Sequence, residues 1–440
     1  METNVILKFI KSQKTFLIIF FIAFFIRAVF ALIRNSPLSG DELFYETTAL
    51  NIMSGYGYSI DGNLTARIPP GYSIFLSFVY SVFGHHFIAI RIVQAIIDAL
   101  MCAVIYLIAK HLFNEKIGIL AGILCASHYF FLKAVQLIRP DTLQMFFIVI
   151  SVLYWIRWRD KFLKKDAILL GLFSSIAVML KANIVILPFI FILIEFFNIV
   201  KNKQAKISIF FKSAIIIIVV FLLPIIPWAV RNYKVYHAFV PLATDSGTAL
   251  YSSYNPPEGK KFGIISNDTI MRDASKIKSE TERSKYLTSK TKEYILSHKK
   301  EVMHLLLYKV LFFWSIFDWE TLGDGRGVYN FSSAFILLLS ILGLIILRRR
   351  MKHFVAIITP IAYMFLLALI FQGLPRFRMP IEPFLIIFAS FFIIYLFDKF
   401  SKKIATFSLL TWFFINFTIF LYTPYAYKTC RIIMRNLQIW

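Results

Sequence analysis

The sequence predicts an all-α integral membrane protein of about eleven transmembrane helices (range 11–13), with interfacial helices and a small extracytoplasmic subdomain. Of its 440 residues, 59% are apolar and only 16% are charged. A soluble domain of this size carries about 25% charged residues. The mean hydropathy is +0.71, and long apolar runs recur along the whole chain. This composition excludes an ordinary soluble enzyme and a disordered chain.

Most of the apolar stretches are long enough to cross about 30 Å of hydrocarbon, and the shorter ones could do so with a tilt or kink. The first is interpreted as an uncleaved span, because it is longer than a signal-peptide core and lacks a small-x-small cleavage site. The predicted spans lie near residues 15–33, 87–109, 117–132, 141–156, 167–180, 183–200, 209–230, 331–347, 354–371, 379–397 and 404–422.

Charge decides the placement of two shorter apolar pieces, 71–83 and 303–317. If both stay on the outer surface as interfacial or re-entrant helices, six cytoplasmic segments hold 21 Lys and Arg, against seven in the short outer segments. The positive-inside rule favours this arrangement. It predicts a cytoplasmic N-terminus, an outer C-terminus and a place in the inner (cytoplasmic) membrane. The six segments are 1–14, 110–116, 157–166, 201–212, 348–353 and 398–403.

The same topology divides the chain into three parts. Residues 1–230 form a seven-span module with a first outer loop over 34–86. Residues 231–330 hold 15 basic and 11 acidic residues and form an extracytoplasmic subdomain with one re-entrant or interfacial helix. Residues 331–440 form a four-span module. The net charge of +24 would suggest a nucleic-acid partner, but topology accounts for much of the surplus, so we expect none.

Two adjacent carboxylates open the first outer loop, at Asp41 and Glu42. Paired acids beside a membrane are costly unless they have partners or a function. One interpretation makes Asp41 a general base at the membrane surface. The other makes Asp41 the N-cap of an interfacial helix that ends before Gly55, with Glu42 favouring the helix dipole. The motif alone leaves both open.

Four cations lie on the outer side, where the positive-inside rule places few of them. Singly, each can be an interfacial anchor or a ligand for an anionic phosphate. Together they face the acids Asp41, Glu42 and Asp141, which is the pattern of a site that holds a phosphate and moves a proton. The four cations are Arg67, Lys181, Arg376 and Arg378.

Other polar features are predicted to be structural. Arg91, Gln94 and Asp98 share one helix face and are expected to join spans. No P-loop, GxGxxG, HExxH or Cys/His pattern at metal spacing occurs in a suitable context, so ATP-driven transport and dinucleotide chemistry have no support.

Taken in order, the motifs resemble those of the GT-C membrane glycosyltransferases, in the branch that contains the protein O-mannosyltransferases and the lipid A aminoarabinose transferase. The seven spans before residue 231 also match the seven-helix module of that superfamily. The motifs are Asp41-Glu42 with Tyr45, Arg67-x-Pro69-x-Gly71-Tyr72, Asp141, Leu180-Lys181, Pro227 to Tyr233, Phe239-Val240-Pro241 and Arg376 to Pro380.

The resemblance implies a GT-C type bundle and an inverting transferase. Such an enzyme takes a sugar from a polyprenyl-phosphate carrier, such as undecaprenyl phosphate, and passes it to a hydroxyl of a lipid, glycan or protein acceptor on the extracytoplasmic face. The implied catalytic residues are Asp41 as the base that deprotonates the acceptor, with Glu42 and Asp141 positioning the acceptor or sharing the proton network. The implied phosphate ligands are the four outer cations, and the implied substrate-positioning residues are Tyr45, Tyr72 and Arg231.

The resemblance has limits. Ala66 stands where the aminoarabinose transferase has a carboxylate, so no metal ligand carries over there, and a divalent metal stays open as a cofactor. The expected partners are the lipid-linked donor, the acceptor and membrane lipids. Two rival functions remain. A lipid-linked sugar flippase or transporter would share the basic outer groove but not need Asp41, and a non-enzymatic scaffold would need neither set of charges.

Overall fold

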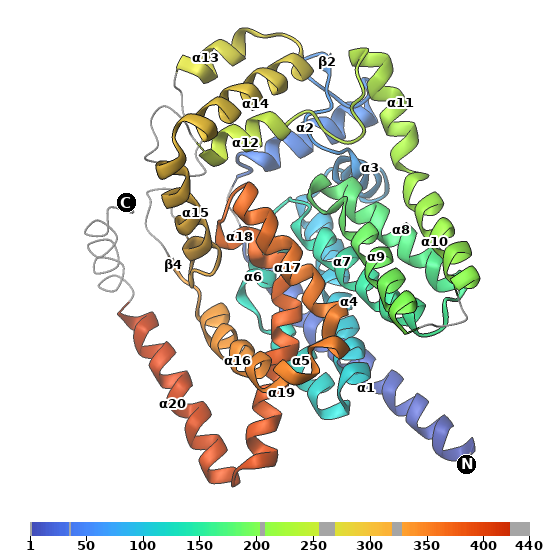
Figure 1. The fold of residues 1–440 in the computed structure, drawn as a ribbon, viewed down its shortest axis with the longest axis vertical. Coiled ribbons are helices and arrows are strands. Elements are labelled where there is room, and N and C mark those ends of the chain that lie inside the picture. The colour runs from blue at the N-terminus through green and yellow to red at the C-terminus, as the bar shows by residue number, and fades with distance from the viewer. Residues whose placement is uncertain (1, 35–36, 203–206, 255–268, 319–327, 423–440) are drawn as a thin grey trace.

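The computed structural model describes residues 2–34, 37–202, 207–254, 269–318 and 328–422. Long helices form an elongated bundle, and shorter helices cover one of its ends (Figure 1). The bundle helices of the first half are α1 (Glu2–Ile33), α4 (Phe87–Leu112), α5 (Glu115–Ala126), α6 (Tyr129–Gln136), α7 (Asp141–Lys161), α8 (Lys164–Leu180), α9 (Leu187–Lys201), α10 (Ile207–Leu222) and α11 (Ile225–Tyr236), with a short turn η1 (Ala182–Ile184) before α9.

The remaining helices fall into two groups. The second half of the bundle contains α16 (Phe331–Leu347), η2 (Arg348–Phe354), α17 (Val355–Ile370), α18 (Pro375–Arg378), η3 (Met379–Ile381), α19 (Glu382–Lys399) and α20 (Lys402–Leu421). The covering group contains α2 (Asp41–Met53), α3 (Gly71–Phe83), α12 (Ser246–Tyr254), α13 (Thr269–Lys276), α14 (Glu280–Ser297) and α15 (Lys299–Phe313).

Two small antiparallel hairpins complete the described fold. Strand β1 (Ser59–Ile60) pairs with β2 (Asn63–Leu64), and β3 (Phe317–Asp318) pairs with β4 (Val328–Tyr329). The predicted all-α class is therefore confirmed, since each strand has only two residues.

Each of the eleven predicted spans corresponds to a helix or a bent helix pair, but their number is not confirmed. By length and composition, six helices of the described chain could cross a membrane, counting Phe331–Ile370 as one. The count rises to eight if each bent pair is one span. The pairs are α5 with α6, bent by 46°, and α10 with α11, bent by 43°. Pro224, which lacks an amide donor, accompanies the second bend. The predicted outer C-terminus lies beyond the described residues.

The positive-inside sorting groups segments that lie at the same end of the bundle. His111 is 3.7 Å from Asp160, and the ring of Phe113 stacks on that of Phe354 at 4.8 Å. The first contact joins two of the segments predicted to be cytoplasmic, 110–116 and 157–166, and Phe354 directly follows a third, 348–353. At the opposite end, the amide of Thr244 donates to the carbonyl of Ala66 at 2.9 Å, so the two long outer stretches meet there.

Helix α3 lies in one of these outer stretches and is too short to cross the bilayer. Its 13 residues span about 20 Å, as expected for an interfacial or re-entrant helix. Its first residue, Gly71, packs against the end of α8: a Cβ atom there would lie 2.5 Å from the carbonyl oxygen of Met179. Glycine therefore allows the Arg67 segment to approach the turn at Lys181.

A buried ion pair ties the spans together. Arg27 of α1 binds Asp98 of α4, and both side chains are fully buried. Arg27 also donates to the carbonyls of Ala126 at 2.9 Å and Cys125 at 3.1 Å. The predicted structural role of Asp98 is thus confirmed, with a partner on α1.

Glu280, the first residue of α14, joins the subdomain to the first outer loop. Its carboxylate accepts hydrogen bonds from the Thr65 hydroxyl at 2.7 Å, the Ala66 amide at 3.1 Å, the Thr244 hydroxyl at 2.7 Å and the Tyr236 hydroxyl at 2.8 Å. Burial alone would raise the pKa of Glu280, but these donors outweigh it and hold the pKa below its usual value of 4.5.

We predict that Glu280→Gln destabilises the protein by about 2 kcal/mol at neutral pH, because the amide accepts these bonds less strongly. A carboxyl with a depressed pKa stabilises the fold above pH 4.5, and this contribution is lost as the pH falls through the folded pKa. Thermal unfolding of both proteins from pH 7 to pH 3 should show a gap that closes on acidification. The exposed neighbour supplies the control, Glu282→Gln. A gap independent of pH would contradict the assignment.

Candidate functional site

Four charged side chains from distant parts of the sequence meet at the covered end of the bundle. Nζ of Lys181 donates to Oδ1 of Asp141. The guanidinium of Arg376 lies 3.6 Å from Oδ2 of Asp141 and 3.5 Å from Oδ2 of Asp41. The structure thus brings together four of the residues that the sequence singles out.

Helix ends place these groups. Asp41 and Asp141 are the first residues of α2 and α7, and Lys181 directly follows α8. Gly40, at φ +57°, occupies the N-cap of α2, so the interpretation of Asp41 as an N-cap is wrong. Without a capping bond, the Asp41 side chain is available for other contacts.

Exposure distinguishes the two aspartates. The side chain of Asp41 is 48% exposed, whereas those of Asp141 and Arg376 are 10% and 16% exposed. Asp141 is therefore held between two cations, while Asp41 can reach a molecule arriving from outside. Burial lowers the pKa of the Lys181 amine from its usual value, against the opposing effect of Asp141.

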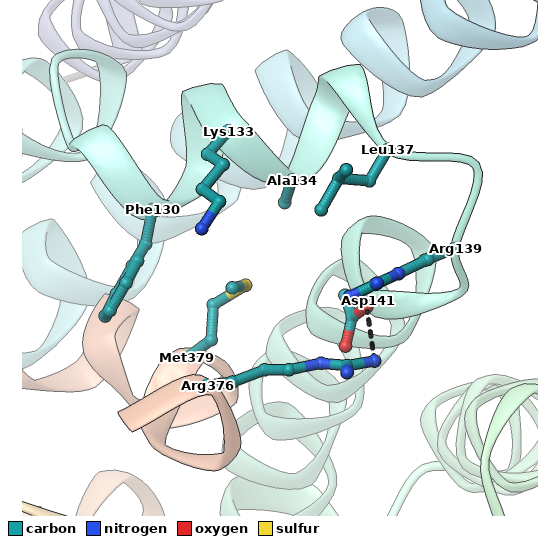
Figure 2. Close-up of a pocket in the computed structure, with 8 residues that line it drawn as sticks. All are labelled: Phe130, Lys133, Ala134, Leu137, Arg139, Asp141, Arg376 and Met379. Atoms are coloured by element: carbon teal, nitrogen blue, oxygen red, sulfur yellow. Dashed lines mark ion pairs between the residues drawn. The ribbon is translucent and has the colours of Figure 1, made fainter. Parts of the chain in front are cut away.

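A small pocket adjoins this cluster (Figure 2). Three cations and one carboxylate point into it, and apolar side chains from α6 and η3 complete its wall. A surface with this combination suits an anionic head group attached to an apolar chain. The lining residues are Phe130, Lys133, Ala134, Leu137, Arg139, Asp141, Arg376 and Met379.

Sequence reasoning did not select Lys133 or Arg139 as site residues. A signal for Lys133 was present, because residues 130, 133, 134 and 137 follow the i, i+3, i+4, i+7 spacing of one helix face. The predicted span ends at residue 132, so Lys133 was not considered together with the face of the preceding helix. Arg139 precedes Asp141 by two residues and lies in the connection between α6 and α7.

Glu42 points into the protein and organises that connection. Its carboxylate accepts two bonds from Arg34, one of them at 2.8 Å, and one from the Ile138 amide at 2.9 Å. Burial would raise the pKa of Glu42, but these donors lower it below its usual value. These contacts suit a positioning residue rather than a group that exchanges protons with substrate.

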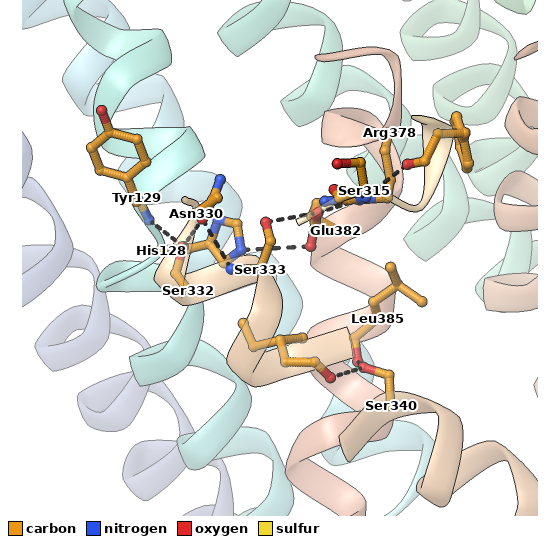
Figure 3. Close-up of polar contacts among 12 residues, drawn as sticks. His128, Tyr129, Ser315, Asn330, Ser332, Ser333, Ser340, Arg378, Glu382 and Leu385 are labelled. Atoms are coloured by element: carbon orange, nitrogen blue, oxygen red, sulfur yellow. Dashed lines mark hydrogen bonds and ion pairs between the residues drawn. The ribbon is translucent and has the colours of Figure 1, made fainter. Parts of the chain in front are cut away.

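Arg378 does not face Asp41, although Arg376 does. Its fully buried guanidinium donates to Glu382 at 2.7 Å and to the carbonyls of Phe313 at 2.7 Å and Ser315 at 2.8 Å (Figure 3). His128, at the start of α6, lies 3.5 Å from the same Glu382. This cluster joins the start of α6, a helix that lines the pocket, to α19.

Arg67 and Arg231 make contacts with neighbouring side chains and with the backbone of the first outer loop. Arg67 lies 3.8 Å from Asp245 and 5.4 Å above the ring of Phe44. Arg231 donates to the carbonyls of Thr65 at 2.7 Å and Tyr58 at 3.0 Å, so it shapes the first outer loop.

The two predicted substrate-positioning tyrosines pack against each other. The rings of Tyr45 and Tyr72 meet edge to face at 5.0 Å, and both side chains are buried. The Tyr72 hydroxyl donates to Gln94 at 2.7 Å, and Gln94 in turn donates to the carbonyl of Leu137 at 2.9 Å. Tyr72 is therefore linked through Gln94 to Leu137, which lines the pocket, and Tyr45 packs against Tyr72.

The donor set does not fit a resident metal ion. Among the residues that the structure describes, no group of three or more His, Cys, Asp or Glu side chains could hold one. The position between Asp41 and Asp141 is occupied by the guanidinium of Arg376.

Comparison with known proteins agrees with this geometry. A family model of dolichyl-phosphate-mannose-protein mannosyltransferases matches residues 67–228. No curated protein sequence matches the chain.

Solved structures extend the likeness to the fold. The oligosaccharyltransferase AglB from Archaeoglobus fulgidus, in complex with an inhibitory peptide and a dolichol-phosphate, matches at a TM-score of 0.57 and 15% identity over 96% of this chain and 56% of that one. A structure of an Archaeoglobus fulgidus oligosaccharyltransferase in complex with Zn and sulfate matches at a TM-score of 0.58 and 15% identity, over 90% of this chain and 52% of that one. This chain thus spans about half the length of these structures. The likeness to ArnT from Cupriavidus metallidurans is looser, with a TM-score of 0.37 and 11% identity over 89% of this chain and 76% of that one.

The predicted resemblance to the GT-C glycosyltransferases is therefore confirmed by one family model over part of the chain and by the fold over nearly all of it. At this identity the structural likeness establishes the fold alone.

Proposed function

We propose that this chain of GT-C fold is an inverting glycosyltransferase. It moves a sugar from a polyprenyl-phosphate carrier to an acceptor hydroxyl at the extracytoplasmic face of the inner membrane. The observation that carries the proposal is the position of Arg376, which lines the cationic pocket and also contacts Asp41. A phosphate in the pocket would lie next to the one accessible carboxylate of the cluster.

The lining of the pocket matches the leaving group. Lys133, Arg139 and Arg376 carry three positive charges against the single carboxylate of Asp141. A polyprenyl phosphate is an anion on an apolar chain, and it gains charge when the sugar leaves. Fixed cations stabilise that charge more in the transition state than in the ground state, which accelerates transfer.

The reaction needs one base. The acceptor oxygen attacks the anomeric carbon on the face opposite the phosphate, and its proton passes to Asp41. The bond between the anomeric carbon and the phosphate oxygen breaks, and its electron pair leaves with the carrier phosphate. Attack from the opposite face inverts the anomeric configuration.

The other site residues have supporting roles in this scheme. Asp141 holds Lys181 and Arg376 in place through its ion pairs. Glu42 positions the connection that bears Arg139 through the Ile138 amide. Arg378 is assigned to the buried cluster with Glu382 rather than to the phosphate.

A lipid-linked sugar transporter remains the rival, since it could use the same cationic pocket. The two functions differ in their products. Purified protein in liposomes, supplied with a panel of polyprenyl-phosphate sugars and envelope glycolipid or glycoprotein acceptors, should form a new glycosidic bond detectable by mass spectrometry. Movement of intact donor across the bilayer, with no glycosylated product from any acceptor and an envelope glycan profile unchanged by loss of the protein, would favour the transporter.

A further inference from the structure

A second, larger hollow lies in the subdomain, between the segment 238–246 and one face of α14. We call it the outer groove, and its empty space, open solvent included, is about 1010 Å³. Six hydroxyl side chains, two lysines and Phe239 line it, and no described Asp or Glu does so. The full lining is Ala238, Phe239, Val240, Pro241, Ala243, Thr244, Ser246, Thr281, Ser284, Lys285, Thr288, Ser289 and Lys292.

The shape of the outer groove is fixed by close packing. A Cβ atom at Gly247 of α12 would lie 2.1 Å from the carbonyl oxygen of Ser284, so the two helix backbones touch. The Gly247 amide also donates to the Ser284 hydroxyl at 3.0 Å. On the opposite wall, Thr244 is held by Glu280 at 2.7 Å. A preformed groove of this kind can bind a ligand without first being ordered.

A chain of contacts leads from the outer groove to Asp41. Asp245, between the lining residues Thr244 and Ser246, lies 3.8 Å from Arg67. Arg67 covers the ring of Phe44, which follows Asp41 by three residues in α2. The cationic pocket reaches Asp41 through Arg376, and the contacts from the outer groove end at Phe44, three residues after Asp41 in α2.

The chemistry of the lining defines the ligand class. Hydroxyl groups on α14 at successive turns can exchange hydrogen bonds with a polyhydroxylated chain. The ring of Phe239 is 82% exposed and offers a flat apolar surface for the face of a sugar ring. Lys285 and Lys292 are exposed, and within the described chain neither is paired with an acid. They favour a negatively charged ligand.

We propose that the outer groove binds an anionic saccharide, which serves as the acceptor and presents a hydroxyl to Asp41. The part of this proposal that names an acceptor rests on the proposed transferase function, whereas saccharide binding does not. Binding can therefore be measured without any donor.

The test uses the full chain in detergent and three probes of matched length: oligogalacturonate, a neutral dextran oligosaccharide and an oligoglutamate peptide. Oligogalacturonate should bind most tightly, and binding should weaken with added salt. The double variant Lys285→Ala/Lys292→Ala should bind it about tenfold more weakly, since it loses two charged hydrogen-bond donors. Phe239→Ala should also weaken it.

The matched control is Lys299→Ala/Lys300→Ala, which removes two exposed lysines outside the outer groove. It should change affinity less than about twofold. Equal losses in both double variants, absence of oligogalacturonate binding, or preference for the peptide or for dextran would overturn the proposal. The two proposals fail separately. Lysine-dependent binding without any sugar transfer would refute the transferase alone, and transfer with an unchanged affinity in Lys285→Ala/Lys292→Ala would refute the groove.

Discussion

Asp41→Asn is expected to reduce the rate of sugar transfer by about 1000-fold, the loss typical of removing a general base. Asparagine keeps the shape of the side chain but cannot take the acceptor proton. Its contact with Arg376 is weak at 3.5 Å, and the side chain is half-exposed, so the fold should not depend on it. Single-turnover transfer with a saturating donor isolates the chemical step.

The matched control is Asp61→Asn, which removes the same charge from the same outer loop. Asp61 is exposed at the β1–β2 turn and has φ 49°, a conformation that asparagine adopts readily. It should transfer sugar at the wild-type rate. A folded Asp41→Asn protein with normal transfer would refute the assignment of the base, whatever the control shows.

Arg376→Gln is expected to weaken binding of the carrier phosphate by about 30-fold, equivalent to about 2 kcal/mol for a lost charged hydrogen bond. Transfer should fall further than binding, because the phosphate gains charge as the sugar leaves. The variant also leaves Asp41 and Asp141 without the cation between them. Affinity for undecaprenyl phosphate and single-turnover transfer should be measured on the same preparations.

Two further variants separate the effect of the Arg376 side chain from that of its charge and of the net charge of the protein. Arg376→Lys keeps the charge but loses the planar fork, so an intermediate loss is expected. Arg272→Gln removes an exposed arginine of α13 and should have no effect. Equal losses in Arg376→Gln and Arg272→Gln would mean that net charge, rather than the pocket, determines affinity.

Two residues of the predicted site were selected because they depart from the usual sorting of charges across a membrane. Lys181 and Arg376 stood out because the sequence predicts them on the side of the membrane where cations are few. The structure brings both to Asp141, although Arg376 is 235 positions away in the chain. Sequence order carries no distance information, so only the shared outer location could suggest this meeting.

The same rule could not separate Arg376 from Arg378. Residues two apart in a helix point in different directions, so one faces the pocket while the other is buried against Glu382. The rule counted Lys133, directly after the predicted span 117–132, among the outer cations but did not mark it as a site residue. Hydrophobicity alone does not show which face of such a stretch meets lipid and which lines a pocket.

The number of spans shows a further limit. Each predicted span falls on a helix or a bent helix pair, but bends at α5–α6 and α10–α11 divide two of them. Helix packing and proline, rather than mean hydropathy, determine such breaks.

The central claim is that the cationic pocket holds the phosphate of a polyprenyl carrier beside Asp41. Its most direct test is the affinity of the purified chain for undecaprenyl phosphate and for undecaprenol, which has the same apolar chain and no phosphate. We predict that the wild type and Asp41→Asn bind undecaprenyl phosphate about equally, that Arg376→Gln binds it about 30-fold more weakly, and that undecaprenol binds far more weakly to all three. Equal binding of the phosphate and the alcohol, or an unchanged affinity in Arg376→Gln, would contradict the account.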